Sequence, residues 1–308
     1  KSLLYQRNIS SISGYQQKWT NQGKIRNKGL EIEVSTHNIR SKDFTWTTSV
    51  NFSLNRNKIL DLGGEPYIIN QGERNETYLS QVGGKSIQFY GFKTNGVWTS
   101  QEEIDNNPHS KEDAPGGMRP VDANGDEVIN DQDRVVIGDP LPDFTWGVTN
   151  SLKYKGFDLS FLFQGVQGVD VINGDWFYNE TKRWHTKYVS NRWISPEHIG
   201  DGKTPYYNNG RNIMLTDKAV EDASYIALRD ITLGYQLPKK LLKKTIFSKV
   251  RVYANAQNLG YWITGNYRGI NPEARHNSGV YNHPLIDGYQ RGAFPIERTF
   301  SFGIDVNF

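Results

Sequence analysis

Long runs in which apolar and polar residues alternate are the feature that most constrains this chain. In residues 44–55, Phe, Trp, Thr, Val and Leu alternate with Thr, Ser and Asn. In residues 300–308, Phe, Ile and Val alternate with Ser, Gly, Asp and Asn. A period of two is typical of a β-strand with one apolar face and one polar face. We therefore expect an all-β fold.

The length of these runs favours a transmembrane barrel. Several reach nine or more residues, whereas strands of ordinary globular proteins average about five or six, and barrel strands cross the hydrocarbon with about 9 to 11. The alternative is a soluble β-sandwich, whose strands also alternate. We predict eight spanning strands, at residues 1–7, 25–37, 43–55, 144–153, 156–165, 224–237, 249–258 and 297–308.

The connections between these strands fall into two sizes. Residues 37–42, 154–156 and 238–249 are short, whereas residues 56–143, 166–223 and 259–295 are long. Outer-membrane barrels have short periplasmic turns and long extracellular loops. The long segments are therefore expected outside the cell, with residues 87–98 as an extra strand in the first of them.

Composition excludes several other classes of protein. The mean hydropathy is -0.67 and 36% of the residues are hydrophobic. No stretch approaches the run of about 20 apolar residues that a spanning helix needs. A net charge of +3 from 36 basic and 33 acidic residues gives no reason to expect a nucleic-acid partner. The absence of cysteine excludes disulfides and thiolate metal sites. No signal peptide opens the chain, so we expect it to be part of something larger.

Five motifs and the last residue carry a resemblance to a known family. They are DANGDEVINDQD at 122–133, IGDPLPDFTWG at 137–147, KGFDLSFLFQG at 155–165, ASYIALRDITLGYQLP at 223–238, VRVYANAQNL at 250–259, and the terminal Phe308. In this order and spacing, they resemble the SusC/RagA family of TonB-dependent outer-membrane transporters. The resemblance covers nearly the whole chain.

The resemblance implies a fold and a set of partners. Members are similar to plugged barrels of about 22 strands in the outer membrane of Gram-negative bacteria. Residues 1–308 would be the C-terminal part of the barrel, with the plug domain and the N-terminal strands outside this chain. Members import oligosaccharides or, in some branches, peptides, together with a SusD-like lipoprotein and TonB. Phe308 would be the signal that the barrel assembly machinery reads.

Residues 122–133 also follow the spacing of a calcium loop. Oxygen-bearing side chains stand at positions 1, 3, 5, 9 and 12, and a backbone carbonyl at position 7 could add a ligand. The predicted ligands are Asp122, Asn124, Asp126, Val128, Asn130 and Asp133. The loop departs from the pattern because position 6, normally glycine, is Glu127. We expect a structural calcium ion, and the alternative is an Asx-rich loop without metal.

Aromatic residues gather in the long segment 166–223. The candidates for contact with a ligand or with the lipoprotein cap are Trp176, Tyr178, Trp184 and Trp193. Such rings could stack on sugars, sit in the aromatic belt of a membrane or pack against a partner, and we favour the partner.

Catalysis is not expected, because the sequence has no G-x-S-x-G motif and no H-E-x-x-H motif. The function predicted from the sequence is therefore oligosaccharide import, with peptide import as the alternative within the family. A secreted, calcium-stabilised sandwich that binds carbohydrate is the alternative from another class.

Overall fold

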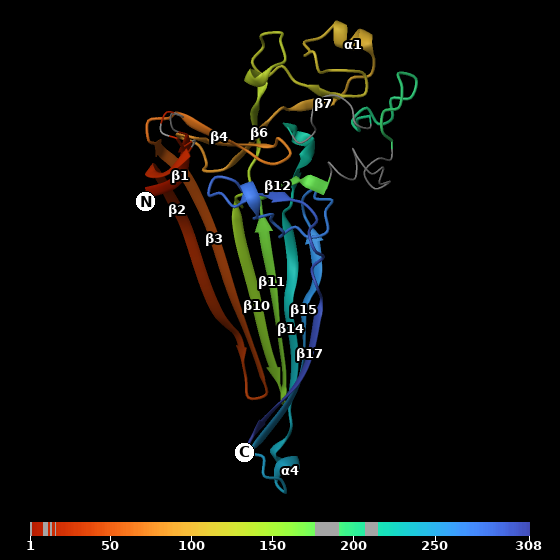
Figure 1. Cartoon of the computed structure of the whole chain (residues 1–308). Coiled ribbons are helices and arrows are strands. Elements are labelled where there is room, and N and C mark those ends of the chain that lie inside the picture. The colour runs from red at the N-terminus through yellow and green to blue at the C-terminus, as the bar shows by residue number, and fades with distance from the viewer. Residues whose placement is uncertain (1, 9–11, 13, 16, 176–190, 207–214) are drawn as a thin grey trace.

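A single large antiparallel sheet forms the lower part of the molecule (Figure 1). The computed structural model describes residues 2–8, 12, 14–15, 17–175, 191–206 and 215–308. The sheet has eight strands in the order β1-β2-β3-β10-β11-β14-β15-β17. Their bounds are β1 Ser2–Asn8, β2 Gln17–Arg40, β3 Phe44–Leu62, β10 Phe144–Tyr154, β11 Phe157–Gln167, β14 Tyr225–Gln236, β15 Lys249–Ile263 and β17 Thr299–Asn307.

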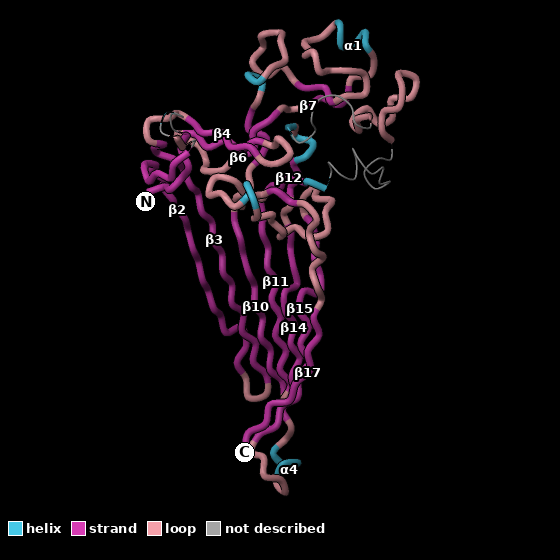
Figure 2. The backbone as a smooth tube through the Cα atoms, viewed as in Figure 1, coloured by secondary structure: helices cyan, strands magenta, loops and turns pink. Residues whose placement is uncertain are grey.

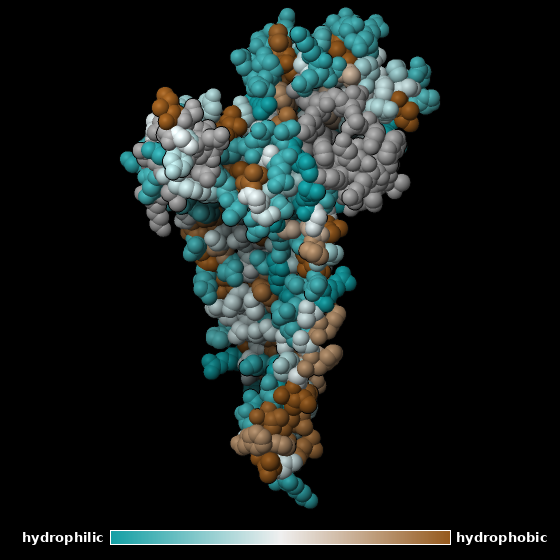
Figure 3. All heavy atoms as spheres, in the orientation of Figure 1, coloured by the Kyte–Doolittle hydropathy of each residue, from teal (hydrophilic) through white to brown (hydrophobic). Residues whose placement is uncertain are grey.

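The strand register confirms the two faces expected from the alternation. Val50 lies opposite Val148, and Phe52 opposite Trp146, so the apolar residues of β3 and β10 share one face. That face continues to the last strand, where Phe302 is 84% exposed. Figure 3 shows hydrophobic atoms gathered at the lower end of the molecule, where β17 and the C-terminus lie.

Asn150, a polar residue in the middle of the apolar face, is paired with neighbouring side chains. Asn150 of β10 accepts hydrogen bonds from Trp46 Nε1 at 2.9 Å and from Thr48 Oγ1 at 2.7 Å, both across the strand pair. Hydrocarbon offers no hydrogen-bond partner, so polar side chains that face it need partners within the protein. The pairing lets Asn150 occupy the apolar face without an unsatisfied carbonyl.

Short turns join the strands at one end of the sheet, here called the inner end. Residues 41–43 connect β2 to β3, and residues 155–156 connect β10 to β11. Lys155 has φ 45° and Gly156 has φ 97°, as required in a two-residue hairpin loop of type I′. The third turn contains α4 (Lys239–Leu242). The short connections predicted from the sequence are thus confirmed.

The long connections fold together at the opposite, outer end, where Figure 2 shows most of the loops. A four-stranded sheet contains β4 (Tyr67–Gln71), β5 (Thr77–Gln81), β6 (Gln88–Gly91) and β9 (Val135–Gly138). A two-stranded sheet pairs β7 (Thr94–Val97) with β8 (Met118–Pro120), and α1 spans Gln101–Asp105. A three-stranded sheet contains β13 (Val220–Asp222), β12 (Asp170–Asn173) and β16 (Tyr289–Gln290). Within the described residues, this outer region also contains the 3-10 helices η2 (Asp131–Asp133), η4 (Asp217–Ala219) and η5 (Gly279–Tyr281).

The core of the molecule lies in this outer region and not between the faces of the large sheet. Its buried cluster includes Tyr78, Phe89, Met118 and Tyr289, which come from β5, β6, β8 and β16. Because loops from the first, second and third long connections meet in it, the outer region is one packed body. No helix in the described residues is long and apolar enough to cross a membrane.

Two of the strand predictions need correction. The strand predicted at 1–7 exists as β1, but it pairs only with residues 17–24 of β2, at the outer end of that strand. Its seven residues end beside the outer part of β2 and do not reach the spanning part. The strand predicted at 87–98 is two strands, β6 and β7, in different sheets. The chain leaves the first sheet at Phe92, whose N–H donates to the carbonyl of Leu215 at 2.8 Å.

Candidate functional site

The polar face of the large sheet carries small, uncharged side chains along β3 and charged ones on neighbouring strands, such as Glu33 of β2 opposite Asn51. Thr45, Thr47, Ser49 and Asn51 of β3 alternate with the apolar set. Ser35 Oγ and Ser49 Oγ lie 2.8 Å apart across β2 and β3. In a barrel wall this face would border a hydrated interior, because the opposite face is apolar.

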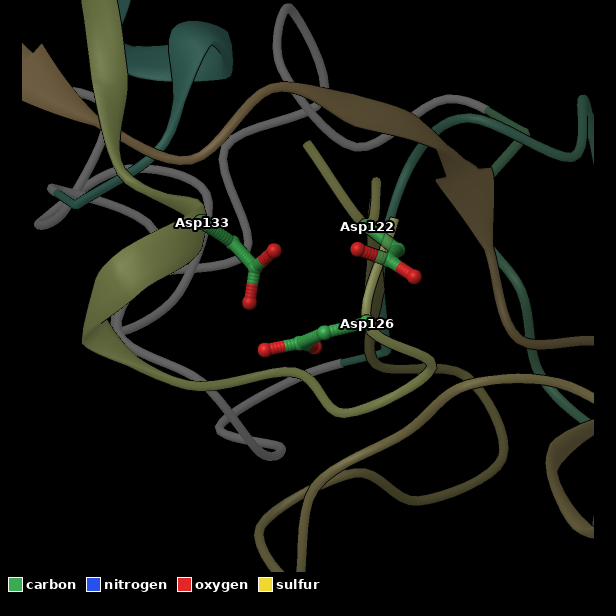
Figure 4. Close-up of side chains that lie close together, drawn as sticks. All are labelled: Asp122, Asp126 and Asp133. Carbon is green, nitrogen blue, oxygen red and sulfur yellow. The ribbon is translucent and has the colours of Figure 1, made fainter. Parts of the chain in front are cut away.

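The predicted calcium loop brings three carboxylates together. Asp122, Asp126 and Asp133 each place a carboxylate oxygen within 4.8 Å of the others, and Figure 4 shows their side chains converging. Asp133 is fully buried, whereas Asp126 is exposed. Three acids in this arrangement repel one another unless protons, hydrogen bonds or a cation offset the charge.

Backbone N–H groups supply part of that compensation. Asp122 accepts from Gly125 N at 2.7 Å and from Glu127 N at 2.8 Å. Desolvation acts to raise the pKa of Asp122, but these hydrogen bonds outweigh it and hold the pKa below its ordinary value. Asp133 accepts from Ala123 N at 3.0 Å and from Asn130 N at 2.8 Å. These hydrogen bonds therefore favour the charged form of Asp122 and hold the carboxylates of Asp122 and Asp133 in place.

The residues fit a calcium ion in part. The sharp turn that usually needs glycine occurs at Glu127, which has φ 66°. Asn124 accepts at its oxygen from Asp126 N at 2.9 Å and donates from Nδ2 to Asp126 Oδ2 at 2.9 Å. Asn130 accepts at its oxygen from Gln132 N at 2.8 Å, so both amide oxygens are already paired with backbone N–H groups. Asn130 and Asp133 also form a capping box on η2, which explains why an acid is useful there even without a metal.

The aromatic candidates have different outcomes. Trp176, Tyr178 and Trp184 lie outside the described residues. Trp193 is 7% exposed, donates from Nε1 to the carbonyl of Thr99 at 3.1 Å and packs edge-on against Tyr206. Trp193 thus stabilises the outer region from within, and its burial gives no support to a direct contact with a ligand or a cap.

A groove that the sequence did not reveal lies between the outer end of β2 and the loops. It has a volume of about 390 Å³ and is lined by Trp19, by residues of β4 and by the segment around η5. Trp19 is 52% exposed and stacks on His283 with ring centroids 6.2 Å apart. Burial lowers the pKa of His283 below its ordinary value, which keeps the imidazole neutral at neutral pH. Asn70, Gln71 and Asn282 supply amides.

Two acids with raised pKa values, one buried and one half-buried, lie in the outer region and were also absent from the sequence predictions. Glu76 is fully buried, and burial raises its pKa even though Tyr281 donates a hydrogen bond to it. Burial, together with the charges of Asp139 and Asp222, raises the pKa of Asp170 to about 6. A single acid in a loop gives no sequence signal of burial, because burial depends on which loops meet.

Phe308 follows the end of β17 and is 82% exposed. Its ring packs on Phe247, with centroids 5.4 Å apart, and its carbonyl accepts from Ser248 Oγ at 3.2 Å. The terminal aromatic therefore continues the apolar face and is accessible at the inner end.

Long outer loops, short inner turns and a sheet with one apolar face together define the class: the chain is part of the wall of an outer-membrane β-barrel. No protein-family model matches the chain. TonB-dependent receptor P26 of Formosa agariphila is 33% identical over 316 residues, covering 99% of this chain and 31% of the relative. SusC of Bacteroides thetaiotaomicron is 28% identical over 94% of this chain and 27% of the relative.

The chain is similar over nearly its whole length to TonB-dependent receptors of the SusC/RagA family, and this similarity together with its fold places it in the outer membrane of a Gram-negative bacterium. It spans about a third of the length of the relatives that it matches. The same fold occurs in a solved structure described as the RagAB peptide importer in the open-open state, with a TM-score of 0.74 and 19% identity. That match covers 100% of this chain and 31% of the solved chain.

Proposed function

We propose that this chain is the C-terminal part of the barrel of a TonB-dependent importer of nutrients. The observation that carries the proposal is the large sheet, whose apolar face suits lipid and whose polar face suits a hydrated interior. Similarity to named TonB-dependent receptors over 99% of the chain supports it. No catalytic role is proposed.

The complete protein would contain the plug domain and the N-terminal strands in addition to residues 1–308. Its partners would be TonB, which acts through the part outside this chain, and a SusD-like lipoprotein at the outer face. The barrel assembly machinery would act on the inner end, where Phe308 is exposed. No nucleic-acid partner is proposed.

An oligosaccharide is the substrate class that we favour. The groove beside Trp19 offers an exposed indole ring and three amide side chains, Asn70, Gln71 and Asn282. Aromatic faces pack against the C–H faces of sugar rings, and amides can both donate to and accept from hydroxyls. Among the residues that the structure describes, none of those that line the groove is Asp, Glu, Lys or Arg, which suits a neutral glycan.

A peptide is the second candidate. The solved structures with the same fold are described as RagAB peptide importers, but at 19–20% identity the likeness extends to the fold alone. β4 is the edge strand of its sheet, and its residues Ile68 and Ile69 line the groove, so an extended peptide could pair with that edge.

Calcium is proposed as a structural ion of the outer region. The convergence of Asp122, Asp126 and Asp133 supports this role, and calcium coordinated by oxygens would offset their mutual repulsion. When bound, the ion would brace the loop before η2 and would take no part in chemistry.

Uptake by cells that lack the complete receptor gene tests the proposal. Cells complemented with wild-type receptor should import labelled oligosaccharides and grow on them, and uncomplemented cells should not.

Trp19→Ala should reduce oligosaccharide uptake about tenfold if one stacked ring contributes roughly 1.4 kcal/mol. Tyr67→Ala, at an exposed ring outside the groove, is the matched control. If the receptor restores uptake of peptides and not of oligosaccharides, the second candidate is selected. If cells with and without the receptor take up both substrates equally, the proposal of import is contradicted.

A further inference from the structure

Four basic side chains form a cluster on the apolar face of the large sheet. Arg26 and Lys28 of β2 lie opposite Lys58 and Arg56 of β3, respectively, and all four are exposed. The register runs without a bulge from the pair at Ile25 to the pair at His37. Strict alternation therefore puts the four cations on the same face as Leu30, Ile32, Val34, Val50, Phe52 and Leu54, and we call them the basic cluster.

The basic cluster lies where the apolar face ends on its outer side. Phe44 and Leu54 are ten residues apart along β3, which corresponds to about 33 Å of strand and about 25 Å of membrane depth at the usual tilt. That depth matches the apolar band of outer-membrane barrels. Arg56 and Lys28 follow two residues beyond Leu54 and Leu30, toward the outer end of the strands (Figure 1). The cluster is therefore at the level of lipid headgroups in the outer leaflet.

The protein leaves most of this charge uncompensated. Arg56 contacts Asp143, with Nη2 3.1 Å from Oδ1 and Nη1 2.8 Å from the backbone carbonyl. Among the residues that the structure describes, no carboxylate forms an ion pair with Arg26, Lys28 or Lys58. Like charges directly opposite on neighbouring strands destabilise a sheet. Because four cations face a single acid, anions from outside the sheet would reduce their mutual repulsion.

We propose that the basic cluster binds the phosphate groups of an anionic, phosphorylated lipid of the outer leaflet. The acyl chains would lie along Leu30, Ile32 and Phe52 while the phosphates meet the cations above them. Guanidinium groups bind phosphate through paired hydrogen bonds, and ammonium groups add point charges. The inference rests on the outer-membrane location and the orientation of the sheet, and it does not depend on import or on the substrate.

Acidic side chains on another strand of the complete barrel are the competing occupant. Residues 25–40 of β2 have no strand partner on the side away from β3 within the described part of the chain. A strand that closes the barrel there could place Asp or Glu beside Arg26 and Lys28. The two occupants differ in one measurable respect, because only the first makes the purified receptor retain phosphorylated lipid.

The experiment measures lipid retained by the complete receptor. The receptor is purified in detergent, incubated with bisphosphorylated lipid A or with its dephosphorylated form, and examined by native mass spectrometry. The wild type should retain the phosphorylated lipid and release the dephosphorylated one. The variant R26Q/K28Q/R56Q/K58Q should retain at least about tenfold less phosphorylated lipid than the wild type, because each basic residue near an anionic surface contributes to the attraction. A shift in electrophoretic mobility on boiling verifies that each barrel is folded.

Two further variants separate phosphate binding from a general effect of charge. K239Q/K240Q/K243Q/K244Q removes the same number of cations at the inner end, around α4, and should retain the lipid as the wild type does. The charge-preserving variant R26K/R56K should keep more than half of the retention. Equal retention of both lipids by the wild type, or equal retention by the wild type and R26Q/K28Q/R56Q/K58Q, would overturn the proposal. The comparison of the two lipids on the wild type needs no variant to fold.

Discussion

Arg251 of β15 and Asp158 of β11 form a paired ion contact across an intervening strand. Arg251 Nε donates to Asp158 Oδ1 at 2.9 Å, and Nη2 donates to Oδ2 at 2.6 Å. The contact passes over Gly234 of β14, where a Cβ atom would lie 2.4 Å from Arg251 Nη2 and 2.6 Å from Asp158 Oδ1. Arg251 also meets Asp305 of β17 at 3.0 Å. One guanidinium thus ties together the polar faces of β11, β15 and β17, and the glycine makes room for it.

Gly234→Ala should therefore destabilise the sheet at its inner end. The added methyl group displaces a paired, charge-assisted contact, and such contacts are worth about 1.5–3 kcal/mol. We expect a lower temperature for the loss of the folded, SDS-resistant form of the receptor, measured by electrophoretic mobility after heating.

A double-mutant cycle identifies the cause. If the methyl group acts through the ion contact, Gly234→Ala should cost much less in a receptor that already carries Arg251→Ala. The same cost in both backgrounds would mean that the methyl group acts through the backbone of β14 and not through Arg251.

Calcium should protect the loop before η2. If the carboxylates of Asp122, Asp126 and Asp133 bind the ion, calcium at a hundred times its Kd should stabilise the bound form by about 2.7 kcal/mol. Hydrogen exchange of amides 122–133 in the complete receptor should slow by about a hundredfold relative to exchange in chelator.

Asp126→Asn separates the metal from the hydrogen-bonded loop. It keeps an oxygen to accept from Val128 N, which lies 2.9 Å from Asp126 Oδ1, but it removes one charge from the ion's ligands and the oxygen that accepts from Asn124 Nδ2. Without calcium the variant should be about as protected as the wild type, because the relief of repulsion offsets the lost hydrogen bond, and calcium should have little effect on it. Glu127→Gln, at an exposed carboxylate whose side chain takes no part in the carboxylate cluster, is the control. Equal exchange with and without calcium in the wild type contradicts a calcium site.

Tyr281→Phe should loosen the third long connection from β5. Tyr281 donates to the buried carboxylate of Glu76 and accepts from Glu73 N at 3.1 Å. Removing the hydroxyl takes one hydrogen bond from a buried carboxylate, at a cost of about 1–3 kcal/mol. Limited proteolysis within residues 264–298 should accelerate, whereas Tyr67→Phe, at a 55% exposed ring, should not change it. Unchanged proteolysis of Tyr281→Phe would show that this hydrogen bond does not hold the loop.

The spanning part of the fold was predictable because local pattern and tertiary environment agree there. A strand with lipid on one side and water on the other must alternate, so residues 44–55 and 300–308 reveal both their conformation and their faces. Hairpins such as that at Lys155 and Gly156 then set the register. The prediction that β1 spans the membrane was wrong, because the residue pattern predicts that a segment is a strand but not which part of a neighbouring strand it pairs with.

The outer region was largely unpredictable from the sequence. The buried cluster there joins Tyr78 to Tyr289, which are more than two hundred positions apart, and no local period reports such a meeting. The same holds for Trp19 and His283 in the groove. The acids of the calcium loop were predictable because all lie within twelve residues, so the spacing itself places their carboxylates together.

The stability of the outer region should depend on pH through Asp170. Its carboxylate accepts from Asp139 N at 3.0 Å and lies in register with Asp222 on β13, and burial is the main reason that its pKa rises from 3.8 to about 6. The folded form therefore takes up a proton at higher pH than the unfolded form. Stability should rise as pH falls from about 7 to about 4, and the gain should be below about 3 kcal/mol because water screens the partly exposed group.

Asp170→Asn should remove this dependence. The amide oxygen can still accept from Asp139 N, but no charge remains to be desolvated, so the variant should be more stable than the wild type near pH 7 and similar to it near pH 4. Thermal unfolding of the outer region, followed by tryptophan fluorescence at ~pH 7.5 and ~pH 4.5, measures both effects. Asp105→Asn, at an exposed acid at the end of α1, should leave the pH profile unchanged. A wild-type profile that is flat, or that falls toward acid and is unaltered by Asp170→Asn, would assign the pH dependence to other groups.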